Sequence, residues 1–201
     1  MRKIVTTFIV VALTMATLAV VALVYVRSSR LSARAEPGPL EARLARTVRS
    51  FAIPSEIKIR TNPIAETPEI LAEALAHYAD HCAVCHGNDG SGNTQMGKGT
   101  WPKAPDMRLE ATQRLSDGEL FHIIEEGVRF TAMPGWSTGT PEGAAASWHL
   151  VHFIRHLPRM TPDEIERMGT LTPRSVDEIR QEMAAEQFLQ GGDAAPPTHA
   201  H

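Results

Sequence analysis

"HCAVCHGNDGSG", residues 81–92, contains the only two cysteines of the 201-residue chain. Cys82 and Cys85 stand three positions apart, and His86 follows directly. A redox-active cysteine pair would need a βαβ setting that this sequence does not show, and a zinc site would lack an assigned fourth ligand. Covalent haem attachment needs only these residues, because each thiol can add to one porphyrin vinyl group while the adjacent imidazole reaches the iron. The motif therefore favours haem.

The chain also contains a residue suited to the opposite face of a haem iron. Met133 lies 47 residues after His86, in the loop sequence FTAMPGW. A lone methionine is more often a core residue, but Pro134 stiffens this loop so that the thioether is presented rather than buried. We therefore predict that Met133 is the second axial ligand.

Helical patterns surround these residues, and we find no convincing strand and no repeat. Thr67 and Pro68 are typical of a helix start, and the helix that follows leads into the cysteine motif. A capping box predicts a second helix over residues 116–126, and an apolar pattern predicts a third from about 141 to 157. The sequence therefore predicts an all-α domain.

The first residues of the chain are strongly apolar. Residues 4–26 carry no charge, and as a helix they would span about 34 Å, close to the thickness of a bilayer core. A cleaved signal peptide is the alternative, because Ala33-Arg34-Ala35 fits a cleavage site. The apolar run exceeds the roughly 7–15 residues of a signal peptide, which favours an uncleaved anchor. Basic residues flank it on both sides and do not decide its orientation.

The net charge of −3 gives no reason to expect a nucleic-acid partner. Charge is unevenly distributed: residues 1–66 carry ten Lys and Arg against four Asp and Glu, whereas residues 67–157 carry six against eleven. The chain is therefore expected to comprise several parts: a transmembrane anchor (1–27), a linker (28–66), a haem domain (67–158), a helical extension (159–192) and a disordered tail (193–201).

Helices are also expected on either side of the haem domain. Capping boxes at Thr161 and Ser175 begin the two helices of the extension, which should lie against the haem domain or a partner. In the linker, apolar residues at helical spacing predict a short amphipathic helix that packs on the following domain or lies on the membrane surface; these residues are Leu40, Leu44, Val48 and Phe51.

Several further histidines could ligate a metal in principle. His149, His152 and His156 recur at helical spacing, but ordinary surface or partly buried roles are favoured for them. His199 and His201 would form at most a weak metal clamp, because they lie on a flexible tail.

Taken in order, these features make the chain resemble bacterial membrane-anchored mono-haem cytochromes c of the class I fold, in which three main helices surround one haem c. The family usually has glycine where this chain has Ala74, at a close helix crossing. Alanine is the next smallest residue, so the crossing should survive. The resemblance covers residues 67–158 and rests on Tyr78, Cys82, Cys85-His86-Gly87, Asp89-Gly90, Pro102, Pro105-Asp106, Gly127-Val128-Arg129, Met133-Pro134-Gly135-Trp136 and the helix around 148–157.

The resemblance assigns roles to the central residues. It implies that Cys82 and Cys85 form the thioethers to one haem c, that His86 is the proximal ligand and that Met133 is the distal ligand. Iron held by His and Met on both faces has no vacant position for a substrate, which indicates an electron carrier rather than an enzyme.

Other residues would support the haem. The resemblance implies that the carbonyl of Pro105, or less favourably of Pro102, accepts the second imidazole N–H of the proximal histidine. Arg129, Trp101 and Trp136 are candidates to meet the haem propionates.

In this family haem c is attached outside the cytoplasm. We therefore expect a single N-terminal pass through the bacterial inner membrane, with residues 1–3 inside and the haem domain in the periplasm. Its partners would be redox proteins of the membrane or periplasm. Two alternatives stay open: a haem c subunit of a larger membrane or periplasmic oxidoreductase complex, and a haem enzyme or sensor in which Met133 dissociates.

Overall fold

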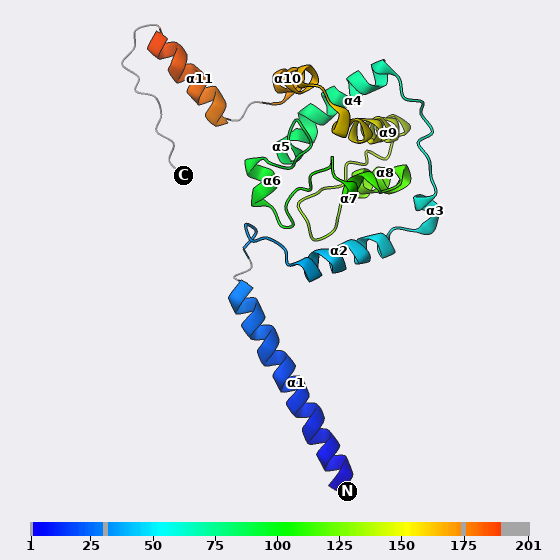
Figure 1. Cartoon of the computed structure of the whole chain (residues 1–201), viewed down its shortest axis with the longest axis vertical. Coiled ribbons are helices and arrows are strands. Elements are labelled where there is room, and N and C mark those ends of the chain that lie inside the picture. The colour runs from blue at the N-terminus through cyan, green and yellow to red at the C-terminus, as the bar shows by residue number, and fades with distance from the viewer. Residues whose placement is uncertain (1, 30–31, 174–175, 190–201) are drawn as a thin grey trace.

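The computed structural model describes residues 2–29, 32–173 and 176–189 (Figure 1). Every regular element in these ranges is helical and none is a strand, which confirms the predicted all-α fold. A globular body contains the helices from α3 to α10, and a long N-terminal helix projects away from it (Figure 1).

The projecting helix is α1 (Arg2–Ser29). Its apolar side chains are exposed along its length. Within the described ranges it is the one helix long and apolar enough to cross a membrane, with a span of Lys3–Ser28. A cleaved signal sequence can also form an apolar helix near the N-terminus. The length of the apolar run is what favours an uncleaved anchor over a signal peptide.

Two helices cross at the centre of the globular body. α4 (Pro68–His81) begins as predicted, with the Ile70 N–H donating to the Thr67 hydroxyl, and it packs against α9 (Pro141–His156). Ala74 is 1% exposed and the neighbouring core residue Val151 is fully buried. The crossing therefore survives with alanine in place of the family's glycine.

The third main helix, α8 (Asp117–Glu126), also packs against α9. The predicted capping box is present between Ser116 and Glu119. Phe121 stacks on Trp148 of α9 with ring centroids 4.1 Å apart. These contacts fix α8, and with it the loop that follows it.

Shorter helices complete the body. They are α3 (Ser55–Lys58), α5 (Ala83–His86), α6 (Gln95–Gly99), α7 (Glu110–Gln113) and the 3₁₀ helix η1 (Leu157–Arg159).

Two helices, α10 and α11, follow the predicted haem domain. α10 (Pro162–Leu171) has the predicted capping box at Thr161 and packs against α4, with Met168 fully buried. α11 (Val176–Leu189) is helical. The predicted cap at Ser175 and the tail with His199 and His201 lie outside the described residues.

The predicted amphipathic helix is also present, as α2 (Pro39–Ala52). It lies along the edge of the globular body from which α1 departs (Figure 1).

Candidate functional site

The cysteine motif forms one short helical turn directly after α4. Cys82 continues from α4, with its N–H donating to the Tyr78 carbonyl at 2.8 Å, and the His86 N–H donates to the Cys82 carbonyl at 2.9 Å. This turn holds both sulfurs and the imidazole in one compact segment. Both cysteines are free and half-buried.

The thiols do not have the character of a redox-active or metal-binding pair. Burial, with a smaller effect of the neighbouring Cys85, raises the pKa of the Cys82 thiol to about 12, and burial also raises the pKa of Cys85. Reactive Cys-x-x-Cys pairs instead have a lowered thiol pKa. Within the described ranges, no group of three or more His, Cys, Asp or Glu side chains could hold a metal ion, so the zinc alternative lacks its ligands there.

The imidazole of His86 has an unusual environment. Its Nδ1 is buried and has no hydrogen-bond partner. Burial lowers the pKa of His86, and the nearby Pro105 carbonyl opposes this effect. The carbonyl is thus close to the ring, although the geometry of a hydrogen bond is not met. Pro102, the alternative acceptor, instead accepts from the Thr100 hydroxyl at 3.1 Å.

Side-chain hydroxyls from both sides of the motif in the sequence hold its backbone. The Tyr78 hydroxyl donates to the Gly87 carbonyl at 3.1 Å, and Gly87 has φ +76°. The Thr94 hydroxyl, at the start of α6, donates to the Val84 and Cys85 carbonyls at 2.9 and 3.1 Å. Both carbonyls are left over at the end of a short helix and need such donors.

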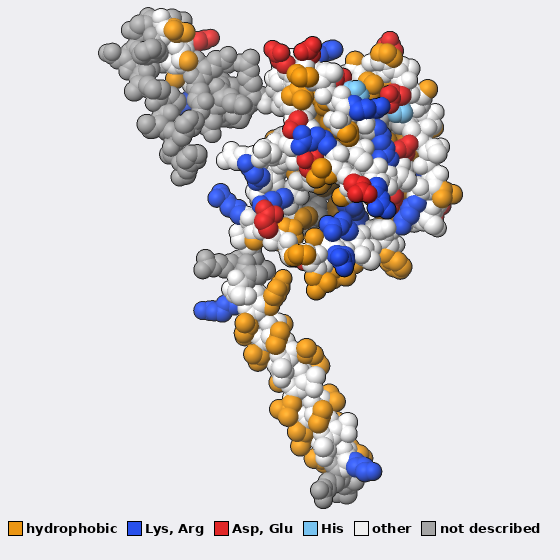
Figure 2. All heavy atoms as spheres, viewed as in Figure 1, with side chains coloured by type: hydrophobic (Ala, Val, Ile, Leu, Met, Phe, Trp, Pro, Cys, Tyr) orange, Lys and Arg blue, Asp and Glu red, His pale blue; other side chains and the backbone are white. Residues whose placement is uncertain are grey.

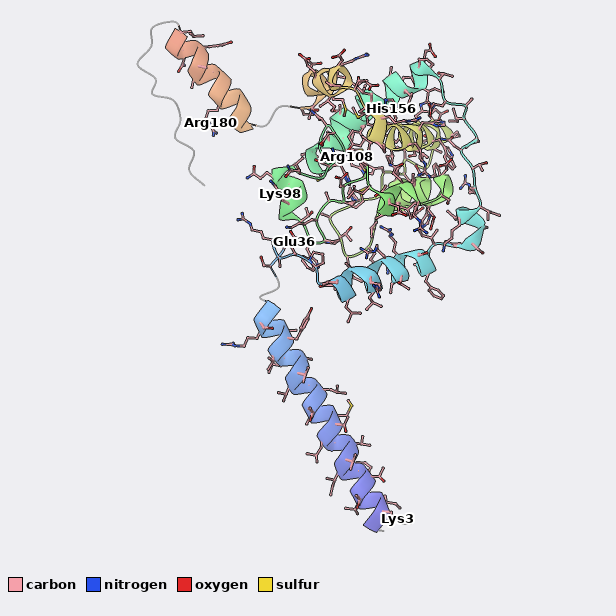
Figure 3. The ribbon with its side chains drawn as sticks, in the orientation of Figure 1. Lys3, Glu36, Lys98, Arg108, His156 and Arg180 are labelled. Atoms are coloured by element: carbon pink, nitrogen blue, oxygen red, sulfur yellow. The ribbon has the colours of Figure 1, made fainter. Side chains whose placement is uncertain are left out.

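The loop that contains Pro105 is clamped against the motif. A Cβ on Gly92 would lie 2.3 Å from the Ala104 carbonyl oxygen, so only glycine fits there. The side chain of Arg108, labelled in Figure 3, makes two hydrogen bonds to Asp106, at 2.7 and 2.9 Å, and a third to Asp89 at 3.0 Å. The Arg108 side chain lowers the pKa of Asp106. This ion pair joins the loop after His86 to the loop of Pro105.

The predicted distal residue lies in a tight loop at the end of α8. The Val128 N–H donates to the Met133 carbonyl at 3.0 Å, and the Met133 N–H donates to the Thr131 hydroxyl at 3.1 Å. Gly127 has φ +69° and ψ −165°. A Cβ there would lie 2.5 Å from the backbone of the residues after Met133.

The chain after Met133 then returns along α8 and reaches the cysteine motif. The Trp136 N–H donates to the Ile124 carbonyl at 2.9 Å. The indole of Trp136 packs edge-on against the His81 ring at 5.3 Å, and His81 directly precedes Cys82. The structure therefore brings the Met133 loop and the cysteine motif together from opposite parts of the sequence.

The side chains predicted to contact the haem propionates are partly or fully exposed. Arg129 is exposed and makes no ion pair with any described residue. Trp101 is half-buried, and Trp136 is 36% exposed. Arg129 and Trp136 lie on the two sides of Met133 in the sequence, and Trp101 lies on the segment before Pro105.

The three histidines of α9 have separate partners rather than a common ligand. His149 lies 3.5 Å from Glu73, His152 Nε2 lies 2.8 Å from the Ile64 carbonyl oxygen, and His156 Nε2 lies 2.8 Å from Glu164. The structure supports the ordinary structural roles that we favoured from the sequence.

Sequence reasoning missed two residues that hold the motif. Thr94 was not assigned a role, although a hydroxyl before a short helical segment is a recognisable capping signal. Gly97 in α6 was missed as well: a Cβ there would lie 2.3 Å from the Cys85 carbonyl oxygen. Its requirement for glycine has no local signal, because it arises from a contact between two helices.

The helical fold, the cysteine motif on its single turn and the returning methionine loop define a c-type cytochrome domain. Residues 70–154 match the family described as cytochrome c oxidase, cbb3-type, subunit III. This match covers less than half of the chain and includes the whole of the site. No curated protein matches the chain. The findings thus support a c-type cytochrome domain over residues 70–154, with an N-terminal apolar helix that fits a membrane anchor.

Proposed function

We propose that this chain is a membrane-tethered electron carrier with one covalently bound haem c. A c-type cytochrome domain implies haem-based electron transfer. The number of haems and their attachment follow from the residues: the chain has two cysteines, and both lie in one motif.

Each side chain of the motif has a defined task in this proposal. Cys82 and Cys85 would hold the haem covalently, each thiol by addition of its S–H across one vinyl group. His86 and Met133 would supply the imidazole and the thioether that ligate the iron. When bound, the haem supplies a one-electron couple between ferrous and ferric iron, and a His/Met pair raises its potential.

The buried, unpartnered Nδ1 of His86 carries the proposal. An unpaired buried ring nitrogen costs about 1–3 kcal/mol, so it needs a compensating function. A small rotation of the ring would allow Nδ1–H to donate to the nearby Pro105 carbonyl. That bond would fix the tautomer in which Nε2 is free to bind metal.

The methionine loop supports the carrier function over catalysis. The Val128 N–H donates to the Met133 carbonyl within the loop, and the Trp136 N–H donates to the Ile124 carbonyl of α8. A thioether on a loop pinned in this way stays in place and keeps small molecules from the iron. The free guanidinium of exposed Arg129 is available to a propionate at the edge of the site.

We further propose that α1 anchors the protein in the inner membrane, with the haem domain in the periplasm. The apolar span of Lys3–Ser28 supports the anchor, and the periplasmic location follows from where haem c is attached in the family. Redox proteins in or near the membrane would then be its partners.

The decisive experiment replaces Met133 with alanine. The variant should keep covalent haem, bind carbon monoxide in the ferrous state, lose the far-red sulfur-to-iron absorption of the ferric state and have a lower potential. Met96→Ala is the matched control, because Met96 is 56% exposed on α6 and should leave all four properties unchanged. A Met133→Ala protein that keeps the far-red band and excludes carbon monoxide would show that another residue is the ligand. Ready binding of carbon monoxide by the unchanged protein would favour an enzyme or sensor.

A second candidate function is that of a subunit in an oxidase complex. The description of the matching family favours it. The protein would then run in native gels of gently solubilised membranes with a larger, oxygen-consuming assembly. A carrier would run alone.

A further inference from the structure

α2 carries an apolar stripe that no described residue covers. Leu40, Leu44, Val48 and Phe51 are 78%, 61%, 57% and 90% exposed. At 100° per residue, these four positions fall within about 80° of one another on the helix. The stripe is therefore continuous and faces outward.

The opposite side of α2 faces the globular body. Ala42 and Arg49 are half-buried and Ile53 is 5% exposed, and these positions lie about 145–185° from the centre of the stripe. Burial lowers the pKa of Arg49, and the charge of Glu119 in α8 opposes that effect. Because this side contacts the domain, the apolar stripe points away from it.

The chain brings α2 close to the end of the apolar helix. Only nine residues separate Ser29, which ends α1, from Pro39, which begins α2, so α2 starts at most about 30–36 Å from that end. Glu36 in this connection forms an ion pair with Lys103 of the globular body. Figure 3 shows Glu36 on the side of the body that faces α1, with Lys3 at the far end of α1.

The exposed surface around the stripe has the composition of a membrane-surface helix. Figure 2 shows hydrophobic side chains along the lower edge of the body, where α2 lies in Figure 1. Arg43 is exposed on the flank of the stripe, about 95° from its centre. Amphipathic helices with apolar residues on one side and arginines beside them lie in the headgroup region of anionic membranes.

We propose that α2 lies flat on the membrane surface, with its apolar stripe among the acyl chains and Arg43 at lipid phosphates. This inference rests on α1 being the tether of the proposed function. Its consequence is orientational: the haem domain is held with its α2 edge on the bilayer, and its opposite side is presented to partners. A domain joined by a free linker would instead rotate at random.

Photochemical crosslinking of the full chain in lipid nanodiscs tests the proposal. The photoreactive residue p-benzoylphenylalanine replaces Phe51 or Leu44 in the stripe, in separate proteins. Ala45 is the control on the same helix, because it is exposed and lies about 105° from the centre of the stripe. Leu13, in the middle of α1, reports the tether. Mass spectrometry then identifies what each position has attached to.

The expected result is that lipid adducts form at positions 13, 44 and 51 and that no lipid adduct forms at position 45. Crosslinks from 44 and 51 to peptides would mean that a second copy or another subunit covers the stripe, and would overturn the proposal. Adducts at 13 alone would place the stripe in water and overturn it while leaving the tether intact. If no lipid adduct forms at position 13, α1 is not in the membrane, and both the proposed tether and the proposed orientation of α2 are wrong.

Discussion

Replacing Gly127 with alanine should displace the methionine loop without changing either proposed iron ligand. Gly127 ends α8 with φ +69° and ψ −165°, a backbone conformation that is essentially restricted to glycine. A Cβ at this position would lie 2.5 Å from Pro134 C, 2.5 Å from Gly135 N and 2.7 Å from the Met133 carbonyl oxygen. All three are backbone atoms, so the loop itself must move.

The expected loss of stability has two contributions. The backbone conformation costs a residue other than glycine about 1–3 kcal/mol, and forcing atoms into a packed contact costs about 1–3 kcal/mol more. Replacing Gly139 with alanine distinguishes the two contributions, because Gly139 has φ +71° but open space around its Cβ position. Gly139→Ala should therefore lose only the first contribution.

Denaturant unfolding and visible spectra of the two variants measure the effect. Gly127→Ala should unfold with a free energy about 1–3 kcal/mol below that of Gly139→Ala. It should also weaken the far-red absorption of ferric haem and admit carbon monoxide, whereas Gly139→Ala should do neither. Equal unfolding free energies, together with an unchanged far-red band in Gly127→Ala, would refute the inferred contact between Gly127 and the methionine loop.

Three further predictions concern the proximal side of the site. Tyr78→Phe should lower the free energy of unfolding by about 1–3 kcal/mol in a denaturant titration, because it leaves a buried carbonyl without its donor; an unchanged midpoint would contradict this. Asp106, whose pKa is lowered by Arg108, should stabilise the fold above the ordinary carboxyl range and cease to do so as the pH falls through its lowered pKa. Asp106→Asn should therefore show a smaller loss of thermal stability than the unchanged protein below a pH of about 4, and parallel curves would count against the ion pair. Cys82→Ser combined with Cys85→Ser should abolish haem staining on denaturing gels, and a double variant that still stains would disprove covalent attachment.

The fold could be predicted from the sequence where local chemistry determines it. Thr67, Ser116 and Thr161 each accept a backbone hydrogen bond at the start of the helix they were expected to begin. Such caps act within one turn of the chain, so their signal lies in adjacent residues. The cysteine motif is local in the same sense, and its turn continues α4 as expected.

What could not be predicted depends on contacts between distant segments. Arg108 joins Asp106 to Asp89, and α10 packs Met168 against the core. Neither contact has a periodic pattern or a motif. The orientation of α2 is a related case: from the sequence alone, its apolar stripe could pack on the domain or lie on the membrane surface. Arg49 is half-buried on the opposite side of the helix, which excludes packing of the stripe on the domain.

Both sides of the proposed iron site are held mainly through backbone atoms. On the proximal side, the Cys85 carbonyl accepts from Thr94 and lies against Gly97. On the distal side, the Met133 carbonyl accepts from Val128. Because these bonds do not depend on the identity of most loop side chains, the loops can vary in sequence around fixed ligands. Gly97 and Gly127 cannot vary, because a Cβ at either position would clash with backbone atoms. The positions of the proposed ligands therefore do not depend on the exposed side chains nearby. Phe130, which is 92% exposed beside the methionine loop, can thus vary to suit a redox partner.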